Sequence, residues 1–120
     1  MSIAGKDVLV VEDESLIVMM VEDLLRDLKT GSVQVASTVQ EALDLLDTRK
    51  FDAAILDIKL KREFSSAVAE RLRERQIPFL VATGYAEYQG EVGGRVLTKP
   101  YTSAQLAEAL AGLTSGAPAR

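Results

Sequence analysis

Charged residues follow three short apolar runs, and their types and order are suited to phosphoryl and metal chemistry. Glu12 and Asp13 follow the first run, Asp57 follows the second and Lys99 follows the third. If the runs are neighbouring parallel strands, three carboxylates and one ammonium group converge at the carboxyl ends of one sheet, where open α/β sheets bind ligands. The sequence therefore predicts a site for a divalent metal ion and a phosphoryl group.

Five short runs rich in Val, Ile and Leu predict the strands that position these residues, at 7–11, 33–36, 53–56, 79–82 and 96–98. Continuous apolar runs of this length are typical of strands buried on both faces of a parallel sheet. Helical spacing and capping patterns predict helices at 16–28, 38–46, 66–75 and 102–113. Five such βα units favour the α/β class, as a doubly wound, five-stranded parallel sheet of flavodoxin-like order.

The remaining segments set the expected domain boundaries. The 120 residues are interpreted as one domain at 1–114 and a small, polar tail at 115–120 that we expect to be flexible. Residues 86–94 contain three glycines and no wide apolar stripe, so we expect a helix there to be short, frayed or absent.

Composition excludes several functions. The chain contains no histidine and no cysteine, which rules out a Ser-His-Asp or Cys-His nucleophilic centre, a thiolate zinc site and a disulfide framework. A net charge of −4 argues against binding a nucleic-acid backbone. No apolar stretch approaches the roughly 20 residues that span a bilayer. We expect a soluble cytoplasmic protein without direct nucleic-acid or membrane partners.

The acidic residues have simpler roles when each is considered alone. Glu12 and Asp13 precede a predicted helix, where acidic residues cap the first turn and interact with the helix dipole. Asp57 ends a strand, where aspartate often starts a turn. Packed together, however, like charges raise one another's pKa, and a cation offsets that repulsion. A hard Mg²⁺ ion suits carboxylate oxygens, a backbone carbonyl and waters.

Lys99 and Thr83 add complementary groups. A lysine is normally a solvated surface charge, but Lys99 precedes a proline at the end of a strand, which constrains its backbone. Thr83 and Gly84 end the fourth strand and supply a hydroxyl and a position where the backbone can approach a ligand closely. An isolated Thr-Gly pair is usually an ordinary turn, so the combination is more specific than its parts.

Four motifs resemble those of response-regulator receiver domains in order and spacing: Val10-Val11-Glu12-Asp13-Glu14, Ile55-Leu56-Asp57, Ala82-Thr83-Gly84-Tyr85 and Lys99-Pro100-Tyr101. The resemblance covers essentially the whole chain. It implies that Asp57 is the phosphoacceptor. It also implies that Glu12, Asp13 and Asp57 hold Mg²⁺, with the carbonyl of Lys59 as a further ligand.

The same resemblance implies further roles at the end of the sheet. Lys99 would pair with the phosphoryl group, and Thr83 would form a hydrogen bond with it after phosphorylation. The Lys99-Pro100 peptide is expected to be cis. Lys59 and Tyr85 each stand two residues after a site residue, and their bulk is expected to shield the acyl phosphate from water and prolong its lifetime.

The implied function is that of a phosphoacceptor in a two-component system or phosphorelay. The donor would be a phosphohistidine on a histidine kinase or histidine phosphotransfer protein, and the output would pass to a downstream protein partner. Such a protein is not an enzyme, although it assists its own phosphorylation and dephosphorylation. Residues 78–85 are similar to the Phe-Ala-Thr-Gly-Tyr-type signature of stand-alone receivers in alphaproteobacterial stress signalling, with Leu80 or Val81 where that subgroup usually has Phe. Val96 replaces the common switch aromatic.

Two alternatives of other classes remain open. The first is a Mg²⁺-dependent phosphohydrolase that uses Asp57 as a turnover nucleophile. Such enzymes usually carry a second Asp two residues later as acid and base, where this chain has Lys59. The second is a receiver-like interaction module that is never phosphorylated, although the presence of all the expected site residues argues against it.

The first predicted helix also suggests a docking surface. Its buried stripe is expected to comprise Ile17, Met20, Val21, Leu24 and Leu28. Val18 and Met19 fall outside that stripe and beside the acidic residues. We therefore expect a helix of the histidine donor to lie across this surface and the loop around Tyr101, where flexible methionine side chains adapt to a partner.

Overall fold

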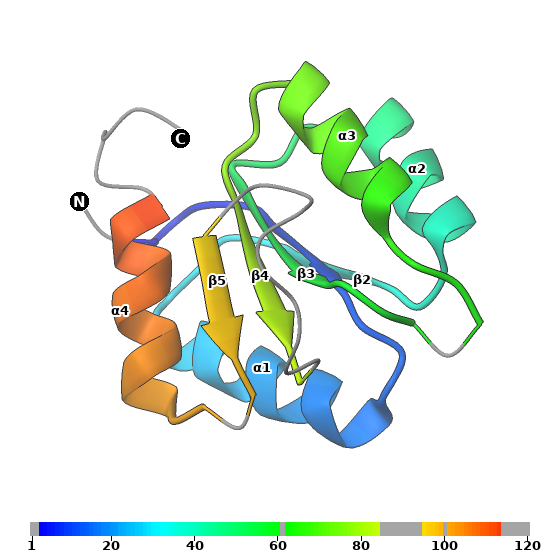
Figure 1. Cartoon of the computed structure of the whole chain (residues 1–120). Coiled ribbons are helices and arrows are strands. Elements are labelled where there is room, and N and C mark those ends of the chain that lie inside the picture. The colour runs from blue at the N-terminus through cyan, green and yellow to red at the C-terminus, as the bar shows by residue number, and fades with distance from the viewer. Residues whose placement is uncertain (1–2, 61, 85–94, 100, 114–120) are drawn as a thin grey trace.

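The computed structural model describes residues 3–60, 62–84, 95–99 and 101–113. Within these ranges the strands are β1 (Val8–Val11), β2 (Val33–Ala36), β3 (Ala53–Asp57), β4 (Phe79–Thr83) and β5 (Arg95–Thr98). The helices are α1 (Ser15–Asp27), α2 (Val39–Thr48), α3 (Ser66–Glu74) and α4 (Ser103–Leu113) (Figure 1). Each bound lies within two residues of its predicted position. The helix considered at 86–94, the Lys99-Pro100 peptide and the tail at 115–120 fall outside the described residues.

All five strands pair in parallel in the order β2-β1-β3-β4-β5. This is the flavodoxin-like order of doubly wound sheets, so the predicted fold class is confirmed. The register pairs Val11 with Leu56, and Asp57 with Ala82. The carboxyl ends of β1, β3 and β4 therefore reach the same edge of the sheet.

The sheet separates two hydrophobic cores. Alternate strand residues point to opposite faces, so Val8 and Val10 pack with α1 and α4, whereas Leu9 and Val11 pack with α2 and α3. Figure 1 shows the corresponding pairs of helices on the two sides of the sheet. Because both faces are covered, the central strands β1, β3 and β4 are buried along their whole length.

Two of the helices begin at predicted capping residues. The Thr38 hydroxyl accepts a hydrogen bond from the Glu41 amide of α2, at 3.1 Å. Before α4, Thr102 and Gln105 form the reciprocal capping box, with bonds of 3.1 and 2.8 Å. The helices of the described residues contain 9 to 13 residues, and none is long and apolar enough to cross a bilayer.

The prediction for α1 was wrong in one part of its buried stripe. Met20 is 47% exposed, whereas Leu25 is fully buried against the sheet. Residues on a helix are separated by about 100°, so a small rotation exchanges the residues at the edges of a stripe. Leu16 and Met19 are 80% and 58% exposed, while Val18 is half-buried. The exposed apolar surface of α1 is therefore formed by Leu16, Met19 and Met20.

Candidate functional site

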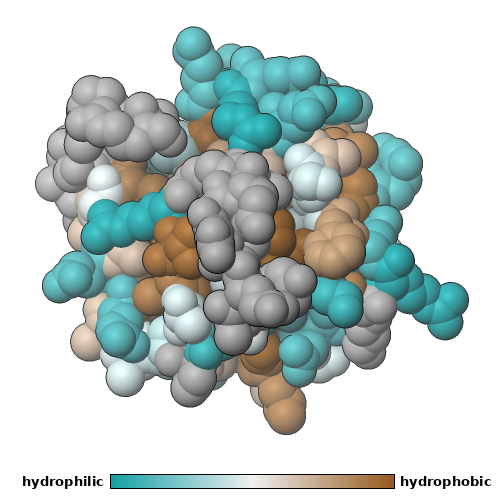
Figure 2. Space-filling model, viewed as in Figure 1, coloured by the Kyte–Doolittle hydropathy of each residue, from teal (hydrophilic) through white to brown (hydrophobic). Residues whose placement is uncertain are grey.

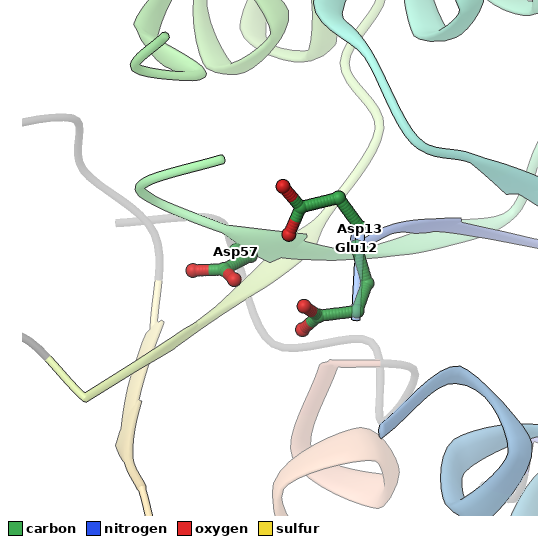
Figure 3. Close-up of side chains that lie close together, drawn as sticks. All are labelled: Glu12, Asp13 and Asp57. Carbon is green, nitrogen blue, oxygen red and sulfur yellow. The ribbon is translucent and has the colours of Figure 1, made fainter. Parts of the chain in front are cut away.

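Three carboxylates gather where β1 and β3 end. Oxygen atoms of Glu12, Asp13 and Asp57 all lie within 4.8 Å of one another (Figure 3). Glu12 and Asp57 are only 5% and 7% exposed, and Asp13 is half-buried. The predicted acidic residues are therefore brought together.

The alternation of the strands explains why these side chains meet. Glu12 continues the row of Val8 and Val10 along β1, and Asp57 continues the row of Ala53 and Ile55 along β3. Both rows face α1 and α4, so the two carboxylates emerge on the same side of the sheet. The Glu12 amide also donates to the Ala36 carbonyl at 3.0 Å, which extends the pairing with β2 beyond the last residue of β1.

Lys99 places an ammonium group between two of the carboxylates. Its Nζ atom lies 3.1 Å from Glu12 Oε1 and 3.2 Å from Asp57 Oδ2. The backbone amide of Lys99 donates to the Thr83 carbonyl at 2.7 Å, so the end of β4 holds the lysine in place. Burial alone lowers the pKa of Lys99, but the charges of Asp57 and Glu12 outweigh burial, and the pKa is raised. The lysine is therefore a permanent cation in the site.

The surroundings of Lys99 favour its charged form, whereas those of Glu12 disfavour the charged form of the carboxyl group. Burial, and then the charge of Asp57, raise the pKa of Glu12, although Lys99 and the Glu14 amide oppose this shift. Its two oxygens already accept hydrogen bonds from Lys99 and from that amide, at 3.1 and 3.2 Å. Lys99 thus pairs with two of the three carboxylates, and the cluster keeps an excess of negative charge. A cluster of hard oxygen donors with this excess of negative charge fits a Mg²⁺ ion.

Thr83 and Lys59 flank this cluster. Thr83 ends β4 and is 2% exposed, one register position beyond the Asp57 and Ala82 pair. The Lys59 amide donates to Asp57 Oδ1 at 3.2 Å, so Lys59 begins a turn directly after the carboxylate. Its side chain is exposed, and its ammonium lies 5.9 Å from the centre of the Phe64 ring. Tyr85 lies outside the described residues.

A residue that the sequence analysis did not single out also contacts the site. Ser65 is buried, and its hydroxyl donates to the backbone carbonyl of Asp57 at 2.6 Å. Its position directly before α3 resembles that of an ordinary helix cap, so the residue pattern alone gives no sign of this contact.

An open groove of about 570 Å³ leads to the carboxylates. The residues that line it come from the start of α1 and from the loop after β3: Asp13, Glu14, Ser15, Leu16, Lys59 and Leu60. The groove is open and lies at the carboxyl end of the sheet. Figure 2 shows apolar surface at the lower edge of the molecule, where α1 lies in Figure 1.

Comparisons with known proteins agree with this geometry. A family model described as the response regulator receiver domain matches residues 8–111. The transcriptional regulatory protein PdtaR of Mycobacterium tuberculosis is 32% identical over 110 residues, covering 86% of this chain and 54% of PdtaR. SdrG of Sphingomonas melonis Fr1 is 42% identical with a TM-score of 0.78, covering 94% of this chain and 98% of SdrG.

A more distant structure has the same fold. The receiver domain of the sensor histidine kinase PA1611 of Pseudomonas aeruginosa PAO1, solved with a magnesium ion coordinated in its active-site cleft, has a TM-score of 0.84 at 23% identity. It covers 94% of this chain and 100% of that domain. The chain spans about half the length of the curated relatives it matches.

Proposed function

Because the chain belongs to the family of response regulator receiver domains, we propose that it accepts a phosphoryl group on Asp57 from a phosphohistidine of another protein. The predicted resemblance to receivers is confirmed by the family match, and the end-to-end similarity to SdrG supports the stand-alone subgroup. The observation that carries the proposal is the meeting of Asp57, Asp13 and Glu12 with Lys99 at one edge of the sheet.

In the proposed reaction a carboxylate oxygen of Asp57 attacks the phosphorus atom of the donor. An oxygen–phosphorus bond forms, the nitrogen–phosphorus bond of the phosphohistidine breaks, and the imidazole nitrogen keeps the electron pair. Glu12, Asp13, Asp57 and the Lys59 carbonyl would hold a Mg²⁺ ion, which would neutralise phosphoryl oxygens in this transfer. Lys99 is already in contact with Asp57, so it can pair with the transferred group without a large movement.

The acyl phosphate would then change the surface of the protein. Thr83 ends the strand next to Asp57, and its hydroxyl would form a hydrogen bond with the new phosphoryl oxygens. Val96 occupies the position of the usual switch aromatic and is 40% exposed on β5. Because valine has no ring to reorient, the signal would have to reach a downstream protein partner by another route. The whole process would take place in the cytoplasm.

Incubation with a small acyl or amido phosphate donor tests this proposal. In the presence of Mg²⁺ the protein should gain one phosphoryl group by intact mass, and a chelator should prevent the gain. Steady release of phosphate from a generic phosphoester would instead favour the phosphohydrolase. No gain from small donors or from the candidate histidine kinases would favour the unphosphorylated interaction module.

The docking prediction can be refined with the observed exposure of α1. Leu16→Ser combined with Met19→Ser should slow phosphotransfer from the cognate kinase about tenfold, equivalent to about 1.4 kcal/mol, which is the loss expected where one of the two side chains is a binding hot spot. The half-buried Val18 is left intact to protect the fold. Transfer from a small donor should stay unchanged, and Val96→Ser, on β5, serves as the exposed apolar control. If the kinase acts equally well on the double variant, it docks elsewhere.

The lifetime of the acyl phosphate provides a separate prediction. Replacing Lys59 and Tyr85 with Ala should speed hydrolysis by up to about tenfold, equivalent to about 1.4 kcal/mol, because water gains access in line with the bond. The decay of the phosphorylated mass gives the rate. Arg62→Ala removes an exposed cation from the same loop and should leave the rate unchanged. Equal lifetimes of the double variant and the wild type would show that these side chains do not shield the phosphoryl group.

A further inference from the structure

Ser65 is a buried hydroxyl between the phosphoacceptor strand and α3. It is 0% exposed and occupies the N-cap position of α3. Serine at an N-cap usually accepts a hydrogen bond from an amide in the first helical turn. Here the side chain makes no capping bond. Its hydroxyl turns back to the carbonyls of Asp57 and Ile58, at 2.6 and 3.2 Å.

The two bonds of this hydroxyl are unequal. A serine hydroxyl has one proton, so the much shorter distance assigns that proton chiefly to the Asp57 carbonyl. The Ile58 carbonyl receives its own donor, the Ser65 amide, at 3.0 Å. Ser65 is therefore fixed through its side chain to the phosphoacceptor residue and through its backbone to the next residue.

These bonds close the loop that follows β3. Within this loop, Lys59 and Phe64 form an antiparallel bridge, and the Leu60 amide donates to the Glu63 carbonyl at 2.9 Å. The Glu63 carboxylate also accepts a hydrogen bond from the Val39 amide at the start of α2, at 3.0 Å. The turn at Lys59 is thus held at its base by Ser65 and at its far end by α2.

We propose that Ser65 is a positioning residue that sets the geometry of Asp57 and of the Lys59 carbonyl for metal binding and phosphoryl transfer. This inference rests on the proposed function. Mg²⁺ requires near-ideal octahedral geometry at about 2.0–2.1 Å, so a ligand that drifts by a few tenths of an ångström weakens binding. Residues that orient metal ligands without touching the ion typically contribute a factor of about 10–100 to affinity or activity.

The test compares Ser65→Ala with the wild type in two measurements. The first is the dissociation constant for Mg²⁺ by calorimetric titration, and the second is the rate of phosphorylation by a small donor at saturating Mg²⁺. We expect the dissociation constant to rise about tenfold and the saturated rate to fall. If Ser65→Ala does not fold, Ser65→Cys replaces it, because a thiol has a similar shape and is a weak donor.

Two control variants separate positioning from general stability. Ser66→Ala removes the neighbouring, exposed hydroxyl. Thr30→Val removes a hydroxyl that donates to the Leu25 carbonyl at 3.1 Å. Thr30 lies in the connection between α1 and β2, at the amino ends of the strands and so away from the carboxylates. Unfolding in urea gives the stability of each variant. Both controls should keep the wild-type Mg²⁺ affinity, even where stability falls as much as in Ser65→Ala.

The outcomes distinguish this inference from the function on which it rests. A wild type that neither binds Mg²⁺ nor accepts a phosphoryl group would overturn both. If the wild type does both and Ser65→Ala has the same Mg²⁺ affinity, only the positioning role is refuted. The same conclusion applies if Thr30→Val weakens Mg²⁺ binding as much as Ser65→Ala does.

Discussion

Asp57→Asn should abolish phosphorylation by small donors and by the cognate kinase. Asparagine keeps the size of the side chain, so the loop and the cluster should keep their shape. Its amide lacks the negative charge that makes the carboxylate a nucleophile, and transfer therefore has no acceptor atom. Intact mass before and after incubation with donor and Mg²⁺ gives the result, with Asp27→Asn as a control at an exposed carboxylate on α1.

The neighbouring carboxylates make the Asp57→Asn result decisive. Glu12 and Asp13 have oxygens within 4.8 Å of those of Asp57, so mass gain alone does not identify the acceptor. Asp57→Asn removes one candidate and leaves two. A phosphoryl group on this variant would place the acceptor elsewhere and contradict the proposed role of Asp57. The same gain in Asp27→Asn as in the wild type is required for the comparison to hold.

The sheet could be predicted closely because its signals are local. Each strand is a short Val, Ile and Leu run bounded by polar or turn residues, and every strand bound was found within one residue. The alternation of strands and helices indicated a doubly wound parallel sheet, for which the observed order is one of the two common ones. Details within elements were harder to predict. The left-handed residue after α1 is Lys29, with φ of 62°, although glycine adopts this conformation more readily and Gly31 stands only two residues later.

Gly31 has a different structural reason. A Cβ atom at this position would lie 2.8 Å from Asp7 Oδ1 and 2.8 Å from the Gly5 carbonyl oxygen. Glycine is thus needed for close approach of two connections, which only the folded chain reveals. Similarly, the exposure of Met20 depends on the exact rotation of α1 against the sheet, and no local pattern fixes that angle.

The candidate site was predictable for a simple topological reason. Parallel strands end at the same edge, so charged residues at the ends of β1, β3 and β5 had to reach one edge of the sheet. The contact of Lys99 with Glu12 and Asp57 follows from that placement. Ser65 could not be found in this way, because its partner is a backbone carbonyl and its direction depends on the dihedral angles at one junction. Unlike the capping boxes at Thr38 and Thr102, this contact to the main chain follows no residue pattern.

Asp13→Asn should weaken Mg²⁺ binding by at least about 100-fold, or about 2.8 kcal/mol. Loss of a residue that only orients a metal ligand, without binding the ion itself, costs at most about this much affinity. Glu12 is already one of the proposed ligands, and both of its oxygens also accept hydrogen bonds within the protein, so it does not replace the lost carboxylate. Glu14→Gln removes the same charge one residue away, at an exposed side chain, and should reduce affinity only slightly. Calorimetric titration with MgCl₂ at constant ionic strength measures both variants. Equal losses in the two variants would mean that Mg²⁺ responds to the overall negative charge, and Asp13 would then not be a ligand.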